Sequence, residues 1–334
     1  LGGLGVATIG AGVMLAAGRK VNLRERSIVQ SALNLESGKG VVRLLKSVFL
    51  TTAIVELAGT AIGYISFSRD HAPMDALGIS LFHAVASFNN AGFDILGNMQ
   101  NLIPYADDVL LNLNTCAMIF FGGIGFPVIL EAARGRLRWR KMSMHARAAI
   151  LTSAVLLVLG AVLLKFTEGF SWLKAVFFSF STRTAGFSTA PLSSFTPAGL
   201  TVAMALMFVG ASPGSTGGGV KTTTLFALLQ GLKSAATNRS EKAFHYSLPK
   251  DAFRKAATIC AMSILAIGTG TFLLLVFEKG LPLSDAMFEM VSAFGTVGLS
   301  TGITPTLSTA GKLLSILVMF IGRLGPMTVC MLRC

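Results

Sequence analysis

The sequence predicts an all-α integral membrane protein built from repeated units, each with a span, a short half-helix, a glycine-containing loop and a second span. Three observations predict this fold class: an apolar composition, apolar runs of spanning length, and a short tract that recurs three times. Hydrophobic residues make up 53% of the 334 residues and charged residues 13%, about half of the ~25% usual in soluble domains. The mean hydropathy is +0.70. A water-soluble chain of this length could not cover such a core with so few charges.

The same composition excludes several other classes of protein. Disordered chains combine low hydrophobicity with high charge density, and this chain has neither. The net charge of +13 does not indicate nucleic-acid binding, because the cations cluster between apolar spans and no basic face is interleaved with aromatic residues. The cysteines lie in or beside apolar stretches, where a thiol behaves as a small hydrophobe and not as half of a disulfide framework. They are Cys116, Cys260, Cys330 and Cys334.

Apolar runs long enough to cross a membrane, or to be the end of a crossing segment, occur throughout the chain. In order they are Leu1–Ala17, Leu45–Phe67, Val109–Leu130, Ala148–Phe166, Leu200–Leu229, Ala256–Phe277 and Lys312–Leu332. The chain starts at Leu1, not at Met, inside the first of these runs, and it stops at Cys334 beside the last. We therefore expect the sequence to be a piece of a longer polypeptide.

Shorter apolar segments between the spans predict half-helices. They cover 75–88, 171–181 and 284–294, and at 1.5 Å per residue they reach only about 16–21 Å, too short for a ~30 Å hydrocarbon core. Asp75, Ser171 and Ser284 are the expected N-caps, and Pro73 and Pro282 stand just upstream of two of them. Half-helices of this kind require that their irregular ends be buried in protein or line water.

A related tract follows each half-helix: Phe88–Phe93, Thr182–Phe187 and Phe294–Leu299. Aligning the glycines of the tracts also aligns a polar residue two places earlier and a large apolar residue one place later. Each tract is followed by a loop and then by a glycine-rich segment, and these segments are Gly122–Gly125, Gly214–Gly219 and Gly322–Gly325. The repeat indicates one supersecondary unit used several times.

The repeat divides the chain into four parts. Residues 1–44 hold the end of the second span of repeat 1 and a cytosolic linker, and residues 45–147 hold repeat 2 with its linker. Residues 148–255 hold repeat 3 with its linker, and residues 256–334 hold repeat 4. The linkers 19–46, 134–147 and 233–255 contain 19 of the 28 Lys and Arg residues. The positive-inside rule therefore predicts a multi-pass protein of the cytoplasmic membrane, with these linkers in the cytosol and the half-helices entering from outside.

The tracts predict a potassium-channel-like pore. Short extended backbone after a re-entrant helix presents carbonyl oxygens to a central axis, where they replace the hydration shell of a cation. Glycine at the turning point permits a positive φ and adds no Cβ to narrow the pore. Packing between helices is the alternative for any one glycine, but three tracts in register favour the filter. The candidate filter residues are Asn90, Ala91, Gly92, Phe93, Thr184, Ala185, Gly186, Phe187, Thr296, Val297, Gly298 and Leu299.

A run rich in glycine interrupts the span after the third repeat's tract. Its residues cannot hold a helix, and non-helical backbone at membrane depth must line a cavity, so we interpret it as a movable constriction below the filter. The candidate gate residues are Ser212, Pro213, Gly214, Ser215, Thr216, Gly217, Gly218 and Gly219. The alternative is a phosphate-binding P-loop. Against it, Val220 intervenes before Lys221, and no strand is predicted upstream.

Arginines inside apolar segments are functional candidates because an intramembrane charge is costly. For Arg323, in the last span, we favour a role near the pore, repelling cations or latching the 212–219 loop, over a purely structural one. For Arg183, at the end of a half-helix, we favour scaffolding by the helix dipole over ion contact. Glu56 lies in a span without a partner that the sequence names. No histidine has metal-ligand spacing, and no nucleophile–base pair suggests catalysis; the histidines are His71, His83, His145 and His245.

At these motifs the chain resembles the Trk/Ktr/HKT superfamily of cation transporters, and looks closest to the KtrB-type potassium-uptake subunits. The resemblance covers nearly the whole chain. It rests on Phe88–Phe93, Thr182–Thr189, Ser212–Thr224, Phe294–Thr301 and Phe320–Pro326, with a further similarity at Met142–Ala146.

The resemblance implies four covalently joined repeats around one pore, with Gly92, Gly186 and Gly298 as the filter glycines of repeats two to four. It implies that 212–219 is an intramembrane gating loop faced by Arg323. It also implies a homodimer opened by a separate nucleotide-binding ring of KtrA or TrkA type, with no cofactor bound to the chain itself and with sodium as a candidate regulator.

Potassium uptake is the function that this resemblance predicts, with K⁺ held by backbone carbonyls. The first filter loop falls outside the sequence, so three loops remain and the first repeat's residue, which bears on sodium preference in the plant branch, is not read. A sodium-permeable or sodium-coupled transporter is therefore the alternative, and an integral membrane nucleotide-binding protein is a more distant one.

Overall fold

The computed structural model describes residues 41–98, 100–134, 138–139, 142–238, 242–244, 246–249 and 251–326. The expectations for 1–40, for the last part of the final span and for several linker cations lie outside these residues. So do those for Cys330, Cys334 and His245.

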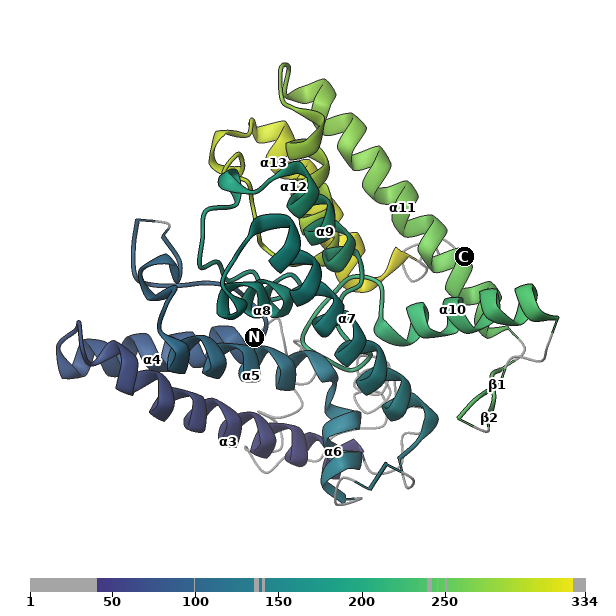
Figure 1. Cartoon of the computed structure of the whole chain (residues 1–334), viewed down its shortest axis with the longest axis horizontal. Coiled ribbons are helices and arrows are strands. Elements are labelled where there is room, and N and C mark those ends of the chain that lie inside the picture. The colour runs from purple at the N-terminus through teal and green to yellow at the C-terminus, as the bar shows by residue number, and fades with distance from the viewer. Residues whose placement is uncertain are drawn as a thin grey trace.

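The described chain is built from helices in a repeating order (Figure 1). A long helix comes first, then a short buried helix, then a second apolar helix. The long helices are α3 (Val41–Phe67), α7 (Met144–Glu168) and α11 (Ala252–Phe277). The half-helices are α4 (Pro73–Phe88), α8 (Trp172–Ser181) and α12 (Leu283–Gly295). The second helices, called inner helices below, are α5 (Val109–Ile124), α9 (Pro197–Phe208) and α13 (Thr309–Leu324).

Smaller elements connect these units. Three 3-10 turns, η1 (Ile103–Tyr105), η3 (Leu192–Ser194) and η4 (Thr304–Thr306), precede the inner helices. Helix α6 (Phe126–Arg134) follows α5, and α10 (Thr222–Thr237) leads to the hairpin of β1 (Lys242–Ala243) and β2 (Tyr246–Ser247). The strands pair antiparallel, with Lys242 opposite Ser247 and Ala243 opposite Tyr246.

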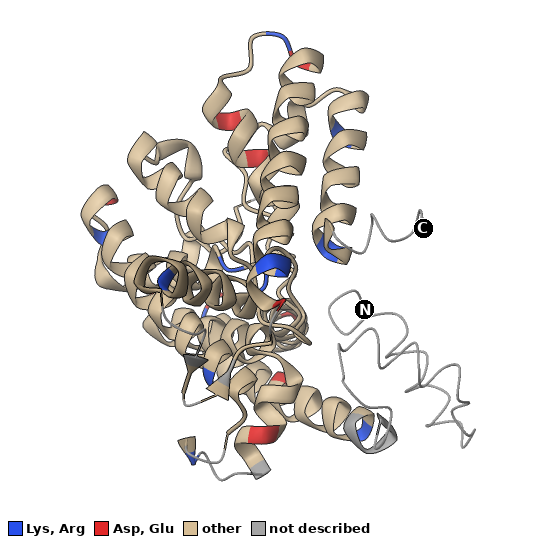
Figure 2. Ribbon diagram, turned by 90° about the vertical axis from the view of Figure 1, so that its right-hand side faces the viewer, with Lys and Arg blue, Asp and Glu red and all other residues tan. Residues whose placement is uncertain are grey.

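The three long helices have the properties of membrane spans. Each is long and apolar enough to cross, and the α5–α6 pair, bent by 98°, makes a fourth if it is counted as one span. Only 28–39% of the residues in their apolar windows are buried inside the protein, so most of this apolar surface faces outward. Figure 2 shows how sparse the charged residues are along the described helices. An apolar outer surface of this kind is suited to lipid.

The half-helices start slightly earlier than expected in two cases. Ser171 caps α8, accepting a hydrogen bond from the backbone N of Lys174 at 3.3 Å. Helices α4 and α12 instead begin at Pro73 and Leu283, so Asp75 and Ser284 lie within the first turn and are not N-caps. The prolines explain the shift, because Pro favours the start of a helix, where its missing N–H is not needed.

The inner helices share their N-terminal chemistry but differ in length. Asp108, Thr196 and Ser308 cap them, each accepting from the backbone N–H three residues on. Helices α5 and α13 have 16 residues and end at a glycine of positive φ, Gly125 (96°) or Gly325 (86°), whereas α9 has only 12 residues.

Two of the expected spans are therefore interrupted. Val109–Leu130 breaks at Gly125, where the positive φ ends the helix. The run 200–229 contains the end of α9, an irregular segment at 209–221, and the start of α10. Glycine and proline in that segment deny it helical hydrogen bonds.

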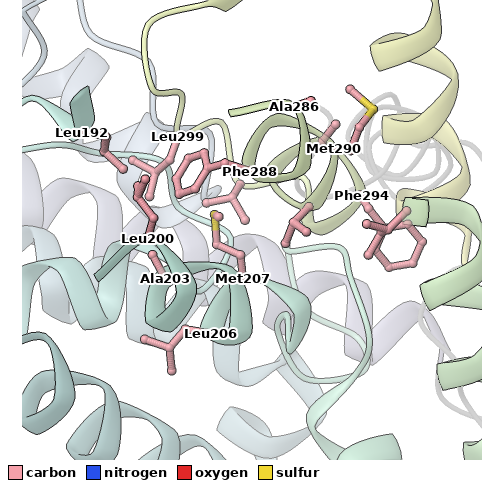
Figure 3. Close-up of a cluster of buried hydrophobic side chains, with 14 of the residues drawn as sticks. Leu192, Leu200, Ala203, Leu206, Met207, Ala286, Phe288, Met290, Phe294 and Leu299 are labelled. Atoms are coloured by element: carbon pink, nitrogen blue, oxygen red, sulfur yellow. The ribbon is translucent and has the colours of Figure 1, made fainter. Parts of the chain in front are cut away.

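The largest buried cluster joins the third and fourth units. Its side chains come from α7, α8, α9, α11, α12 and α13 and from the segments between them, and Figure 3 shows a part of it in which most labelled residues belong to α9 and α12. Phe288 and Phe294 of α12 and Met207 of α9 are fully buried in it. This packing fixes the half-helix of one unit against the inner helix of its predecessor, and so positions the tract that follows.

Glycines permit an equally close contact within a unit. A Cβ on Gly122 of α5 would lie 1.8 Å from the carbonyl oxygen of Phe88, and one on Gly322 of α13 would lie 1.8 Å from that of Phe294. The inner helix therefore packs backbone to backbone on the last residues of α4 or α12.

This contact generates a stability prediction. We expect Gly122→Ala to lower the free energy of unfolding by about 1–3 kcal/mol, the usual cost of overpacking. Gly78→Ala is the matched control, since Gly78 also lies in a helix but has nothing within 4 Å of the added Cβ; it should stabilise by about 0.5–1 kcal/mol. Thermal melting of the purified protein in detergent measures both. Equal melting temperatures would contradict the contact.

Candidate functional site

The three tracts adopt the same unusual backbone. Asn90, Thr184 and Thr296, which the alignment places in register, have φ values of 50°, 70° and 52°. Two places on, the tract glycines are also at positive φ: 69° for Gly92, 83° for Gly186 and 92° for Gly298. Threonine rarely adopts this region because it is β-branched. A shared outlier at the same position of three tracts indicates a built feature rather than a chance turn.

The tracts lie side by side with their backbones in contact. A Cβ on Gly92 would be 2.4 Å from the carbonyl oxygen of Ala185, and a Cβ on Gly186 would be 2.2 Å from that of Val297. The α-carbon of Gly186 is 4.0 Å from the Cβ position of Gly298. The tracts of repeats 2, 3 and 4 therefore lie next to one another in chain order. At Gly92 and Gly186 there is room only for a hydrogen atom in place of a side chain.

Side chains of the tracts are mostly turned into the protein. Ala185, Phe187, Val297 and Leu299 are buried, whereas Phe93 is 68% exposed. The Asn90 side-chain amide donates to the hydroxyl of Thr184 at 2.9 Å. This bond joins the tract of repeat 2 to that of repeat 3. The groups left to act on an ion are therefore backbone groups.

The ends of the half-helices support a positive charge near the tracts. Helices α4, α8 and α12 end at Phe88, Ser181 and Gly295, where the tracts begin. A helix C-terminus carries a partial negative charge of about half an elementary charge. Three such ends on neighbouring tracts make a site that favours a cation.

One position behind the tracts differs from unit to unit. Nine residues before the tract glycines stand His83, Phe177 and Glu289, and all three are buried. The His83 Nε2 atom is 2.8 Å from the Thr115 hydroxyl, and the His83 ring packs edge-on against Phe187 in the tract of repeat 3. Extending the alignment of the tracts backwards would have found this position; its partners are not readable from sequence.

Glu289 holds the loop that follows the tract of repeat 4. Its carboxylate accepts hydrogen bonds from the hydroxyl of Ser300 and, at 3.0 Å, from that of Thr304. Asn101, which sequence reasoning also missed, has a comparable role. Its side-chain amide donates to the Gly92 carbonyl at 3.1 Å, and its side-chain oxygen accepts from the backbone N of Ser188 at 3.0 Å.

The 212–219 loop lies against the first residues of all three tracts. The Thr216 hydroxyl donates to the carbonyls of Gly122, at 3.1 Å, and Phe88, at 3.3 Å. A Cβ on Gly217 would be 2.2 Å from the Thr184 hydroxyl. The backbone N of Gly218 donates to the Thr296 hydroxyl at 3.1 Å.

Further backbone bonds fix the ends of the loop to two inner helices. The Ser212 N–H donates to Gly123 of α5 at 2.9 Å, and the Gly219 N–H donates to Gly322 of α13 at 3.3 Å. The loop therefore spans the space between the units directly beside the tracts.

Cationic side chains hold this loop, and the backbone just before it, by carbonyl groups. Arg323 donates to the carbonyl of Thr216, so it faces the loop. Lys221 donates back to Gly217 at 2.7 Å. Arg183 donates to the Ser153 and Gly210 carbonyls, both at 3.2 Å, in agreement with the scaffolding role that we favoured for it.

The phosphate-binding alternative does not fit this geometry. Helix α9, not a strand, precedes the loop. Lys221 is also engaged with the loop's own carbonyl, whereas a P-loop lysine reaches outward to phosphates. Within the described ranges, no three His, Cys, Asp or Glu side chains are close enough together to hold a metal ion. Glu56 does have a partner, the side-chain amide of Asn89 at 2.9 Å.

Comparisons with known proteins agree on one family. The TrkH family, described as a cation transport protein, matches residues 1–149 and 144–334. Ktr system potassium uptake protein B of Bacillus subtilis (strain 168) is 34% identical over 98% of this chain and 76% of its own length. Potassium/sodium uptake protein NtpJ of Enterococcus hirae is 33% identical over the same two shares.

A solved structure shows the same fold. The potassium transporter TrkH from Vibrio parahaemolyticus matches 99% of this chain and 69% of its own, with a TM-score of 0.74 at 19% sequence identity. The predicted all-helical membrane fold is thereby confirmed.

The Glu289 contacts generate a prediction for the outer loop. Glu289→Ala removes the acceptor for two hydroxyls and leaves a cavity, so we expect it to destabilise the protein by about 1–3 kcal/mol. Glu289→Gln keeps the size and an acceptor oxygen, and should cost clearly less. Thermal melting compares the two variants. If Gln is as damaging as Ala, one acceptor oxygen is not sufficient and the full carboxylate is required, since Glu289 uses one oxygen for each hydroxyl.

Proposed function

The chain belongs to the TrkH family of cation transport proteins, and from this membership we propose that it takes potassium into the cell by gated, passive permeation. It is a multi-pass membrane transporter and not an enzyme. The observation that carries the mechanism is the set of three tracts with one backbone conformation, lying side by side at the ends of three half-helices.

Potassium loses its hydration shell to backbone carbonyls of residues 90–93, 184–187 and 296–299. Carbonyl rings of this kind select among cations without a charged ligand. The Gly92 carbonyl already accepts a bond from Asn101, which holds that peptide in place. The membrane potential supplies the driving force, about 2.3 kcal/mol per charge per 100 mV, so transport needs no cofactor bound to the chain.

The 212–219 loop is the gate of this pathway. It is packed against Thr184 and Thr296 at the inner ends of two tracts. Arg323 supports the closed position by its bond to Thr216, and its positive charge also opposes a cation below the filter. Opening requires that these bonds be broken.

Sodium is the alternative ion. One relative named above carries both ions in its name, and the sequence contains only three of the four expected tracts. Glycine at all three central positions favours potassium, since glycine leaves the carbonyls free of side-chain crowding.

Orientation and partners follow from the basic linkers. We place the linkers in the cytosol and the outer ends of the tracts on the extracellular side. The repeat boundaries are at 44, 147 and 255. The linker segments 134–141 and 233–255 are suitable contacts for a separate nucleotide-binding ring of KtrA or TrkA type. In this proposal the chain works as a homodimer, any nucleotide acts through that ring, and sodium is a candidate regulator.

Potassium uptake by the complete polypeptide, in a bacterium without its own uptake systems, tests the function. We expect growth at low potassium that resists excess sodium. Gly186→Ala should abolish uptake because its Cβ would meet the Val297 carbonyl at 2.2 Å. Gly169→Ala is the matched control: Gly169 has a φ of 65° but nothing within 4 Å, so it should transport normally.

Two results would count against these assignments. Normal transport by Gly186→Ala, at equal membrane expression, would refute the filter. Uptake that sodium suppresses in proportion to its concentration would support the sodium alternative.

The gate gives a separate prediction. Arg323→Gln removes the charge and the guanidinium bond to Thr216, so we expect a higher basal flux in liposomes without any partner. Arg323→Lys retains the charge and should lie between the variant and the parent. Fluorescence assays of potassium flux measure the series. A flux lower than that of the parent in Arg323→Gln would show that Arg323 does not hold the loop closed.

A further inference from the structure

Two apolar grooves open on the outer surface of the described helices. The first lies among α5, α7 and α8 and has a volume of about 690 Å³. The second lies among α9, α11 and α12 and has a volume of about 700 Å³. Both volumes fall in the range of about 300–1,000 Å³ that is typical of ligand pockets.

The grooves are built from equivalent positions of successive units. On the inner helices, Ala117 and Phe120 stand as far beyond the N-cap of α5 as Ala205 and Phe208 stand beyond that of α9, and all four line a groove. A groove that recurs with the repeat is a property of the unit and not an accident of one packing defect.

The long helices show the same correspondence. Val158 and Ala161 precede Glu168 of α7 by as many residues as Gly268 and Thr271 precede Glu278 at the end of α11. The half-helices add a stripe spaced by four residues: Trp172, Val176 and Phe180 on α8, and Leu283, Met287 and Val291 on α12. Such spacing puts the side chains on one face of a helix.

The chemistry of the lining identifies the occupant. No charged side chain lines either groove, and hydroxyls are contributed only by Thr201 and Thr271 in the second. Both grooves are walled by long helices with the properties of membrane spans, so they face hydrocarbon. A second copy of the chain does not account for both grooves, because a two-fold dimer buries one patch per subunit, whereas the grooves are lined by different sets of helices.

We propose that each groove binds one acyl chain of a membrane phospholipid. In the first groove the chain runs along α8 from Trp172 to Phe180, a distance of about 12 Å at 1.5 Å per residue. Trp172 is 58% exposed at the first turn of α8, and tryptophan favours the headgroup level of a bilayer. The headgroup therefore lies at the Trp172 end.

The inner end of the first groove leads towards the loop at 212–219. A small cavity of about 20 Å³ shares Phe120, Leu157 and Phe180 with the groove, and Arg183 and Ala211 form part of its wall. Arg183 holds the carbonyl of Gly210. A chain seated in this groove thus ends next to the residues that fix the start of the loop.

Photocrosslinking in vesicles tests the site. The complete protein is reconstituted in phosphatidylethanolamine and phosphatidylglycerol vesicles containing a phospholipid with a diazirine near the end of one acyl chain, and labelled residues are mapped by mass spectrometry. We expect labels to concentrate on groove residues. Ala117→Phe should remove the labels from the first groove only, and Ala205→Phe from the second only. Both alanines are exposed, so the phenylalanine fills the groove without displacing the core.

Three outcomes would overturn the proposal. Labelling as strong at Leu57, which is exposed on α3 outside both grooves, would show a general lipid coat. Labels unchanged in both variants would show that the grooves are not the site. Disulfide crosslinking of Ala117→Cys between two copies would show that protein covers the groove. This readout is independent of transport, so its failure is distinct from a failure of the proposed function.

Discussion

The Val297 carbonyl lies where a side chain on Gly186 would have to be, and the Ala185 carbonyl stands in the same relation to Gly92. This approach of backbone to backbone constrains the rest of the structure. It requires glycine in the tracts, half-helices that end beside them, and inner helices whose own glycines pack on the Phe88 and Phe294 carbonyls. The outward faces of the long helices can then be largely apolar, because the polar groups at the centre of the protein are main-chain groups of the tracts.

Main-chain groups outside helices must be satisfied within the protein at membrane depth, and the loop at 212–219 meets this requirement. Its N–H groups bond to carbonyls of α5 and α13 and to a tract hydroxyl, while Arg323 and Lys221 donate to its carbonyls. The same bonds that make the irregular segment tolerable also hold it beside the tracts. In the proposed mechanism, the stability of the closed state and the obstruction of the pathway are thus two results of one hydrogen-bond network.

The sequence was sufficient for the features that depend on local pattern. The three tracts, their register and the loop followed from glycine spacing, and the resemblance to the Trk/Ktr/HKT superfamily implied that Arg323 faces the loop. It was not sufficient where distant residues decide. The partners of Glu289 and Asn101 are set by how loops fold back, and two N-caps were misplaced because prolines moved the helix starts. The break of Val109–Leu130 at Gly125 was also missed, since glycine is common inside spans.

Helix α9 is four residues shorter than α5 and α13, and among the inner helices of the described residues it is the one followed by the irregular segment at 209–221. A gate formed by a symmetric ring of inner helices would require the inner helices of all repeats to move together. In the proposed mechanism one loop closes the pathway, and both of its ends belong to one repeat. The residues that set how readily this loop moves include its contacts on α5 and α13 as well as those of its own repeat. Substituting them need not alter the tract glycines, so ion preference and ease of opening can evolve separately within one polypeptide.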